Sequence, residues 1–327
     1  SASRMDRVRQ CHFGYFMQYG LRAKERRPAG FEAPEIGTFL HYLLENTARE
    51  VAGSGGWASV KTPQLHAMVR KYIDLYIRDE ITGYEEKSAR FRYLFGRLRT
   101  TAEDIVDRMA EELAESDFKP VAFELGFGGR DGTLPAITIQ EGDATLSVSG
   151  KVDRVDGWLH DGKLYLRVVD YKTGRKSFDL SDVRYGLGIQ MLLYLFTLEK
   201  EGQSCFGYPI VPAGVLYHPA RDLILKADRD ITPEALRRAM DRELRRDGMV
   251  LGDPEVLRAM EHSALEAPCF LPIQVSKDGG ISGGVATAAQ LGRLGQYVEK
   301  LLHQIIRELR QGNIDADPCW RGPQESA

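Results

Sequence analysis

The segment from residue 144 to residue 174 constrains the fold most strongly, because strand composition and a tight turn occur together in it. The run "ATLSVSGKVDRVDGWLHDGKLYLRVVDYKTG" is rich in β-branched and aromatic residues, and "HDGK" offers an Asp-Gly turn between its last two strands. The upstream run "PVAFELGFGG" and the downstream run "AGVLYHP" also have strand composition. The sequence therefore predicts a β-meander followed by a further strand.

Helical patterns surround these strands. Apolar residues recur at helical spacing in "PEIGTFLHYLLENTARE", and a second helical block continues to about residue 116. Helical periodicity returns in residues 180–202, 233–246 and 286–311, whereas the tail "IDADPCWRGPQESA" is irregular. This order predicts a mixed α/β fold. We expect a helical N-terminal portion over residues 1–116 and a core with C-terminal helices over residues 117–327, together in one compact domain.

Composition limits the class of protein without identifying a partner. The chain has 327 residues, with 44 basic and 47 acidic side chains, so net charge gives no argument for nucleic acid. Three basic runs, at residues 22–28, 90–99 and 237–246, are each either a solvated helix face or a phosphate-binding patch. The run "RFRYLFGRLR" is the best candidate for such a patch, because aromatic residues alternate with its arginines.

No targeting or membrane segment is expected. The sequence has no run of 18 or more apolar residues, and "SASRMDRVRQC" lacks the apolar region of a signal peptide. Its four cysteines are widely spaced, which does not indicate a disulfide framework. These features predict a reduced, cytoplasmic protein without contact to a membrane.

A charged pair ends the strongest strand. Side chains alternate between faces along a strand, so Asp170 and Lys172 in "VVDYKTG" point the same way as the apolar residues Leu164, Leu166 and Val168. An isolated charge in such surroundings costs several kcal/mol unless a partner compensates it. The pair is therefore either a salt bridge at a strand end or a group that serves chemistry.

The hairpin turn brings a second carboxylate beside the first. Asp153 in "GKVDRVD" lies on the preceding strand and can face Asp170 across the ladder. Two carboxylates about 4 Å apart repel each other by roughly 4 kcal/mol at an effective dielectric constant near 20. Mg²⁺ removes this conflict, since it prefers oxygen ligands, and the Tyr171 carbonyl is a candidate third oxygen. Lys172 could then orient a water and offset charge on a phosphate, which predicts phosphodiester hydrolysis.

Two similar motifs in the chain are weaker. Asp-x-Lys occurs again at Asp117 and Lys119, but there it follows the predicted end of a helix rather than an apolar strand. The run "GWLHDGKL" matches Gly-x4-Gly-Lys without the final Ser or Thr, and it lies in the predicted hairpin turn instead of leading into a helix. We therefore expect no ATP site in this chain.

The combined pattern "GKVDRVD…LRVVDYKTG…QMLLY" resembles the nuclease domain of the RecB-like branch of the PD-(D/E)XK superfamily. The resemblance implies a restriction-endonuclease-like core, in which a mixed β-sheet is flanked by helices. It also implies catalytic roles for Asp153, Asp170, Lys172, Gln190 and Tyr194. Gln190 and Tyr194 are four residues apart on a predicted helix, so they share one face and could point at the site or at DNA. A helical glutamine is otherwise most often solvent surface.

The resemblance also assigns metal ligands. His41 in "GTFLHYLLE" matches a histidine on an upstream helix of the family, and joins Asp153, Asp170 and the Tyr171 carbonyl as a predicted ligand to Mg²⁺ or Mn²⁺. The alternative for His41 is an ordinary core histidine. Glu45, one helical turn later, and Glu124, in "AFELGF", are further candidates.

The opening residues, "AGVLYHP" and "LPIQVSKDGGI" resemble the C-terminal region of the AddB component of bacterial AddAB helicase–nucleases. This implies processing of double-strand breaks, an AddA-type partner subunit, and cleavage of the 5′-terminated single strand of unwound DNA. In that family a cysteine like Cys11 joins three C-terminal cysteines to hold a [4Fe–4S] cluster. Here no Cys-x-x-Cys is present, so we expect the sequence to be a fragment that cannot hold the cluster by itself, with Cys205, Cys269 and Cys319 as ordinary residues.

Two other functions compete with this one. A catalytically silent DNA-binding or scaffolding domain would be expected to lack one of His41, Asp153, Asp170 and Lys172, and all four are present. A Cas4-like exonuclease would share the nuclease motifs, but the long segment after Tyr194 and the ends of the chain argue against it. The sequence therefore favours a metal-dependent deoxyribonuclease.

Overall fold

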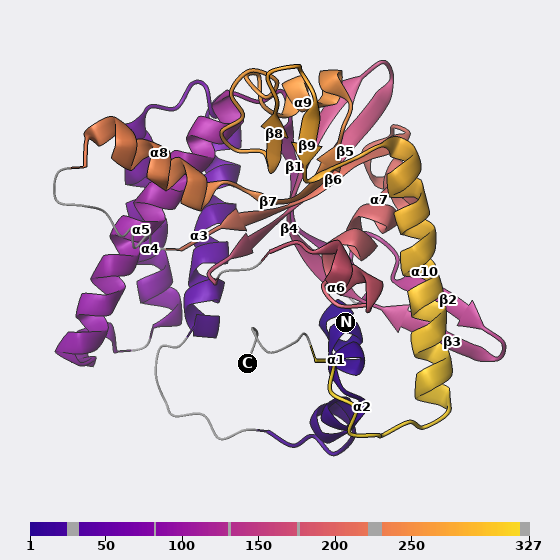
Figure 1. Ribbon diagram of the computed structural model, residues 1–327. Coiled ribbons are helices and arrows are strands. Elements are labelled where there is room, and N and C mark those ends of the chain that lie inside the picture. The colour runs from indigo at the N-terminus through magenta and orange to yellow at the C-terminus, as the bar shows by residue number, and fades with distance from the viewer. Residues whose placement is uncertain (25–32, 82, 130–131, 175–176, 222–230, 321–327) are drawn as a thin grey trace.

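A twisted six-stranded sheet lies between two groups of helices in the computed structural model, which describes residues 1–24, 33–81, 83–129, 132–174, 177–221 and 231–320 (Figure 1). The strand order is β1-β4-β5-β6-β7-β10. β4 pairs antiparallel with β1 and β5, β6 pairs antiparallel with β7, and the pairs β5–β6 and β7–β10 are parallel. The predicted mixed sheet with flanking helices is thus confirmed.

The strands follow the helical N-terminal part of the chain. The sheet consists of β1 (Lys119–Phe127), β4 (Gly150–His160), β5 (Lys163–Lys172), β6 (Ile210–Pro219), β7 (Asp247–Leu251) and β10 (Val285–Ala286). Two hairpins lie outside it, formed by β2 (Ile137–Glu141) with β3 (Ala144–Val148) and by β8 (Ile273–Val275) with β9 (Ile281–Gly283).

Ten α-helices are present in the described residues. They are α1 (Ala2–Gln10), α2 (His12–Tyr15), α3 (Ala33–Gly53), α4 (Thr62–Glu80), α5 (Ala89–Ala114), α6 (Leu180–Arg184), α7 (Gln190–Phe206), α8 (Pro233–Leu244), α9 (Pro254–Met260) and α10 (Ala288–Arg310). A π-helical turn at Phe16–Gly20 and a 3₁₀ turn at Tyr84–Glu86 complete the set. None of the helices in the described part of the chain is both long and apolar enough to cross a membrane.

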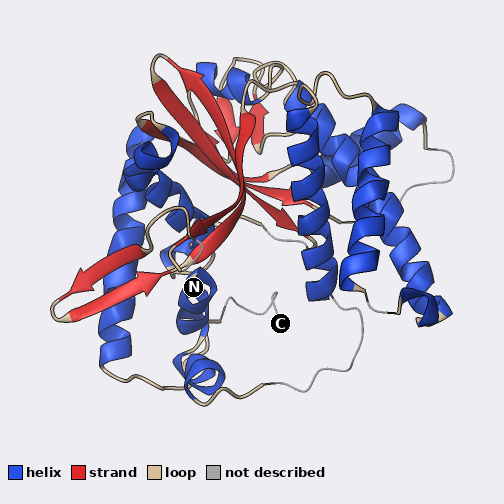
Figure 2. Ribbon diagram, turned by 180° about the vertical axis from the view of Figure 1, so that it is seen from behind, coloured by secondary structure: helices blue, strands red, loops and turns tan. Residues whose placement is uncertain are grey.

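Two hydrophobic cores occupy the two faces of the sheet. One core joins α1, α7 and α10 to the strands, with Val168, Leu192 and Leu302 among its buried residues. The other forms between α3, α4 and α5 and reaches the sheet at Tyr171. Figure 2 shows the sheet between these helical groups. The N-terminal helices therefore divide between the two faces, and the expected division at residue 116 stays a prediction.

Local signals explain where several helices begin. The Thr287 hydroxyl accepts a hydrogen bond from the Gln290 amide, and the Gln290 side chain accepts one from the Thr287 amide, which forms a capping box at the start of α10. Asp253 caps α9 in the same position, and Pro254 follows it with a backbone angle suited to a first turn. These caps satisfy amide groups that have no partner within the helix.

The structure differs from the sequence prediction in two places. Helical periodicity predicts one helix over residues 180–202, but Gly186 and Gly188 adopt positive φ angles of 82° and 65° and separate α6 from α7. Gln190 is consequently the first residue of α7. The strand β7 lies between predicted helices and was missed, because five residues without alternation give a weak signal.

Candidate metal centre and active site

Three neighbouring strands place acidic residues in one row across the sheet. In the β1–β4 ladder, Phe123 pairs with Arg154 and Leu125 pairs with Val152, which puts Glu124 opposite Asp153. In the β4–β5 ladder, Arg154 pairs with Val169, and one further step brings Asp153 opposite Asp170. The hairpin turn that sets this register has Asp161 and Gly162 at φ 48° and 73°, as the Asp-Gly sequence predicts.

Glu124 adopts a backbone conformation that glutamate rarely occupies. Its φ of 51° lies in the left-handed region, and such a residue costs on the order of 1 kcal/mol or more. Strain of this kind persists where surrounding contacts hold it, and it concentrates at functional sites. Here it accompanies the turn of the Glu124 side chain toward His41 and Asp153.

His41 from α3 completes a group of three ligand-type side chains. Its Nδ1 atom is 3.4 Å from Asp153 Oδ1 and 4.0 Å from Glu124 Oε1, and its Nε2 atom is 3.3 Å from the Tyr171 carbonyl oxygen. His41, Glu124 and Asp153 each offer one ligand atom, and these atoms all lie within 4.8 Å of one another. Two carboxylates and an imidazole suit a divalent cation such as Mg²⁺ or Mn²⁺.

The electrostatics of this group indicate excess negative charge. Burial raises the pKa of Glu124, and the nearby carboxylates of Asp153 and Glu45 raise it further, although the Lys151 ammonium opposes them. Burial alone would lower the pKa of His41, but the hydrogen bond and charge of Asp153 outweigh burial and the pKa is raised. Both shifts favour binding of a positive charge, as a proton or as a metal ion.

Asp170 and Lys172 form an ion pair beside this group. The Lys172 ammonium also lies 5.7 Å from the centre of the Tyr217 ring. The structure does not bring Asp170 into the three-residue group, where Glu124 stands instead, although Asp170 was predicted as a ligand. Asp153 keeps one oxygen for the backbone, since Asp153 Oδ2 accepts a hydrogen bond of 2.8 Å from the Tyr171 amide.

Gln190 and Tyr194 brace the beginning of β4. The Gln190 amide donates a hydrogen bond of 3.2 Å to the Tyr194 hydroxyl, and Tyr194 is 2% exposed. A Cβ atom on Gly150 would lie 2.0 Å from that hydroxyl, so this position requires glycine. Because Gly150 is three residues before Asp153, the two side chains are placed to fix the strand that carries Asp153. Their catalytic role stays a prediction.

Glu45 and Cys11 lie outside the group. Glu45 forms an ion pair of 2.8 Å with Arg49, whose guanidinium also donates to the Phe123 carbonyl. The Cys11 thiol accepts a hydrogen bond from the Gly14 amide at the start of α2, and the Cys319 amide donates to the Gln10 carbonyl next to it. All four cysteines are free thiols. The part of Cys11 in an iron–sulfur site stays a prediction.

The two weaker motifs have structural explanations. The Lys119 ammonium donates to the carbonyls of Leu113 and Ser116 and so caps the end of α5, while Asp117 pairs with His262. The run "GWLHDGKL" forms the turn between β4 and β5. Neither motif contributes to the three-residue group.

The basic runs are mostly helix faces. In α5, Phe95 is buried and Phe91 is half-buried, whereas Arg90, Arg92 and Arg97 face solvent. The run at residues 237–246 divides, because Arg246 is buried and Arg237 pairs with Glu111 on α5. Residues 25–28 of the first run lie outside the described residues.

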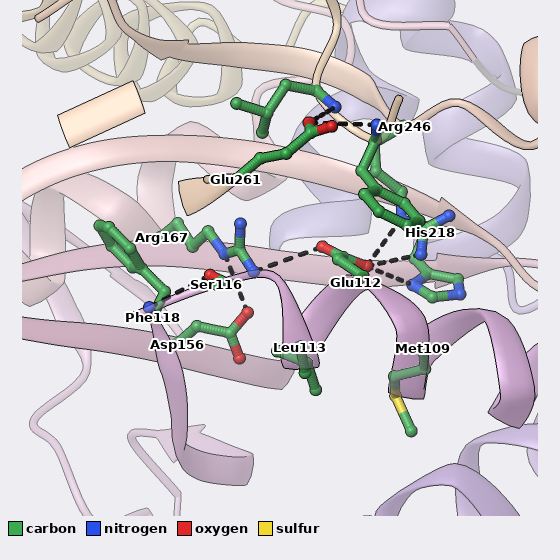
Figure 3. A network of polar contacts seen from close by, with 12 residues as sticks. Met109, Glu112, Leu113, Ser116, Phe118, Asp156, Arg167, His218, Arg246 and Glu261 are labelled. Atoms are coloured by element: carbon green, nitrogen blue, oxygen red, sulfur yellow. Dashed lines mark hydrogen bonds and ion pairs between the residues drawn. The ribbon is translucent and has the colours of Figure 1, made fainter. Parts of the chain in front are cut away.

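A second charged group, the buried charge cluster, lies behind the site and was missed by sequence reasoning. It consists of Glu112, Arg154, Asp156, Arg167, His218 and Arg246, which are all 2% exposed or less. Figure 3 shows most of the cluster, with Glu112 on α5 facing Arg167, His218 and Arg246. The alternation in "KVDRVDG" and "LYLRVVDYK" was the available signal, since Arg154, Asp156 and Arg167 point away from Asp153 and Asp170.

Arginines neutralise both carboxylates of this cluster. Arg154 Nε and Arg167 Nε each lie 2.9 Å from an Asp156 carboxylate oxygen, and Arg246 Nε donates to Glu112 at 3.0 Å. Burial would raise the pKa of Glu112, but the charges of the three arginines hold that pKa well below its usual range. Arg154 also donates to the Tyr171 hydroxyl at 3.2 Å, which connects the cluster to the residue whose backbone contacts His41 and Asp153.

Comparisons with known proteins agree with this geometry. The family model of the PD-(D/E)XK nuclease superfamily matches residues 1–322. The AddB-type component of an ATP-dependent helicase/deoxyribonuclease from Acetivibrio thermocellus is 34% identical over 97% of this chain, and its counterpart from Caldanaerobacter subterraneus is 33% identical over all of it. The chain spans 28% of the length of each relative. With a family model that covers nearly its whole length, the chain belongs to the PD-(D/E)XK nuclease superfamily.

Proposed function

We propose that this chain is a metal-dependent nuclease domain that hydrolyses phosphodiester bonds of DNA. The observation that carries this proposal is the group of His41, Glu124 and Asp153 next to the Asp170–Lys172 pair. Ligand atoms from two strands and a helix converge there beside an ammonium, which is the set of groups that metal-assisted hydrolysis of a phosphate requires. The deoxyribonuclease named among the relatives supports the choice of substrate.

The three side chains would hold one divalent ion, Mg²⁺ or Mn²⁺, with the Tyr171 carbonyl and Asp170 within the same region. When bound, the ion would supply Lewis-acid stabilisation of the phosphate charge. His41 joins the helices α3–α5 to this chemistry, since Glu124 and Asp153 come from the sheet. A gap between ligands of 4.8 Å or less suits an ion with ligand distances of about 2.0–2.1 Å.

Lys172 would act on the reacting groups. Its ammonium is held by Asp170, so it is positioned to orient the attacking water and to offset the charge that develops on the phosphate. Gln190 and Tyr194 would keep β4 in place and so hold Asp153 in register. A silent scaffolding domain would not need these groups to converge.

The wider context is also a proposal. The names of the relatives, and the resemblance to AddAB enzymes, suggest that the domain works in a helicase–nuclease that processes double-strand breaks. In that setting an AddA-type subunit would be its partner, and the 5′-terminated single strand would be its substrate. Cys11 would contribute to a [4Fe–4S] cluster in the full-length protein.

The test is cleavage of an end-labelled single-stranded oligonucleotide with Mg²⁺ or Mn²⁺. We expect Asp153→Asn and Asp170→Asn to lower the rate by about a thousandfold, which equals about 4 kcal/mol of transition-state stabilisation. Asp161→Asn is the matched control, because Asp161 is an exposed aspartate in the β4–β5 turn. Equal rates for the Asp153 variant and the control would contradict the proposal.

A further inference from the structure

A cavity of about 260 Å³ adjoins Lys172 on the side away from the three-residue metal group. Lys172, Tyr217, Arg221, Glu243, Arg245 and Asp247 line it. None of these residues except Lys172 has a part in the proposed chemistry. Lys172 therefore belongs both to the candidate active site and to the wall of this cavity.

The cavity continues the row of residues that carries the metal group. Asp170 pairs with Tyr217 in the parallel ladder of β5 and β6, and Tyr217 pairs with Asp247 in the antiparallel ladder of β6 and β7. The row thus runs Glu124, Asp153, Asp170, Tyr217, Asp247 across five adjacent strands, and Figure 1 shows β5, β6 and β7 side by side. Asp247 is two strands from Asp170, which is about 10 Å.

The charges on the wall suit an anion. Three cations, Lys172, Arg221 and Arg245, face two carboxylates, Glu243 and Asp247, so the formal balance is one net positive charge. The Arg245 guanidinium is fixed by the carbonyls of Pro268 and Ile273, at 2.8 and 3.3 Å.

Arg221 is the more adaptable of the two arginines. Its side chain is 19% exposed, and its contacts to Glu243 are long, at 3.3 Å to the carboxylate and 3.5 Å to the carbonyl. A guanidinium held this loosely can turn its remaining N–H groups to a phosphate.

We propose that this cavity binds a backbone phosphate of the DNA strand whose neighbouring phosphodiester lies at the metal group, with Arg221 as the direct contact and Arg245 as a fixed charge. This inference rests on the proposed function. The shared wall at Lys172 makes the two sites continuous, and a separation of about 10 Å corresponds to on the order of three nucleotides at B-form rise. The subsite would hold the strand in register without taking part in bond cleavage.

The test is binding of a fluorescent fifteen-residue oligothymidylate, measured by anisotropy without divalent metal over a series of salt concentrations. We expect Arg221→Gln to weaken binding about tenfold and to reduce the slope of log K against log salt by about 0.7, the value for one phosphate of a single strand. Arg221→Lys should restore most of the affinity, because it keeps the charge. Arg238→Gln, an exposed arginine on α8, is the matched control and should change binding by less than about twofold.

Equal affinity and equal salt slope for the Arg221→Gln and Arg238→Gln variants would overturn the subsite. Failure of the proposed function gives a different result, because binding needs no cleavage. Cleavage of thymidine 5′-(p-nitrophenyl) phosphate, which carries no neighbouring phosphate, separates the two further. Its rate should be unchanged in Arg221→Gln, whereas a loss of that rate equal to the loss of DNA binding would contradict a role confined to the strand.

Discussion

The metal group and the buried charge cluster lie on the same two strands and solve the same electrostatic problem in different ways. Asp153 and Arg154 are neighbours on β4, yet one points to the metal group and the other into the cluster. In the cluster, three arginines surround Glu112 and Asp156. At the metal group, the carboxylates meet one histidine and the Lys151 ammonium, so their charge is not fully compensated by the protein.

The pKa directions record this difference. The arginines lower the pKa of Glu112 although it is fully buried, whereas burial and neighbouring carboxylates raise the pKa of Glu124. A chain that can place three arginines behind the sheet has left the front short of cations. The front is thus arranged for a cation from solution, while the cluster is arranged to hold the helices α3–α5 on the sheet.

Removing a charge from the cluster should have the largest effect on stability. Glu112→Gln leaves three buried arginines with Asp156 as their remaining carboxylate, and we expect the free energy of unfolding to fall by about 3–5 kcal/mol. Urea denaturation measures this change. Glu111→Gln is the control on the adjacent, half-exposed residue, and it should cost less than about 1 kcal/mol. Similar losses for both variants would show that the cluster is not the main link between helices and sheet.

Adding a cation should stabilise the front. At a Mg²⁺ or Mn²⁺ concentration of a hundred times Kd, we expect the free energy of unfolding to rise by about 2.7 kcal/mol. Asp153→Asn should lose this gain, while its stability without metal should equal or exceed that of the parent protein, because a repelling charge is removed. Thermal unfolding with and without metal tests both points, with Asp161→Asn as the control. A gain that survives in the Asp153 variant would argue against the metal group.

The pH dependence of stability should reveal the cluster. The pKa of Glu112 is depressed in the folded protein below the ordinary value of 4.5, so its contribution is fully present above pH 4.5. As pH falls below 4.5, the unfolded chain takes up a proton that the folded chain excludes, and stability is lost by up to about 1.4 kcal/mol per pH unit. Comparing acid unfolding of the parent protein with that of Glu112→Gln isolates this loss. Parallel curves below pH 4.5 would contradict the assignment.

Sequence reasoning reached the front of the sheet better than its back. The Asp-Gly turn and the two-residue period fix which residues of β4 and β5 are neighbours, so the meeting of Asp153 with Asp170 could be predicted. Glu124 was a weaker candidate, because its position depends on a backbone angle of 51° that the sequence does not signal. The cluster joins residues as far apart as Glu112 and Arg246, and local patterns carry no information on such pairs.

The smallest effect tests whether Lys151 is the front's partial substitute for a metal ion. The Lys151 ammonium lies 3.1 Å from Glu124 Oε2 and its side chain is 59% exposed, so the pair should contribute less than about 1 kcal/mol to stability. Lys151→Met should nevertheless tighten Mn²⁺ binding about threefold, since a competing positive charge is removed from a ligand carboxylate. Titration calorimetry with Mn²⁺ measures this, with Lys163→Met, at the far end of β5, as the control. Weaker binding in the Lys151 variant would mean that the lysine supports the metal group instead of competing with it, and the contrast with the buried charge cluster would then lose its basis.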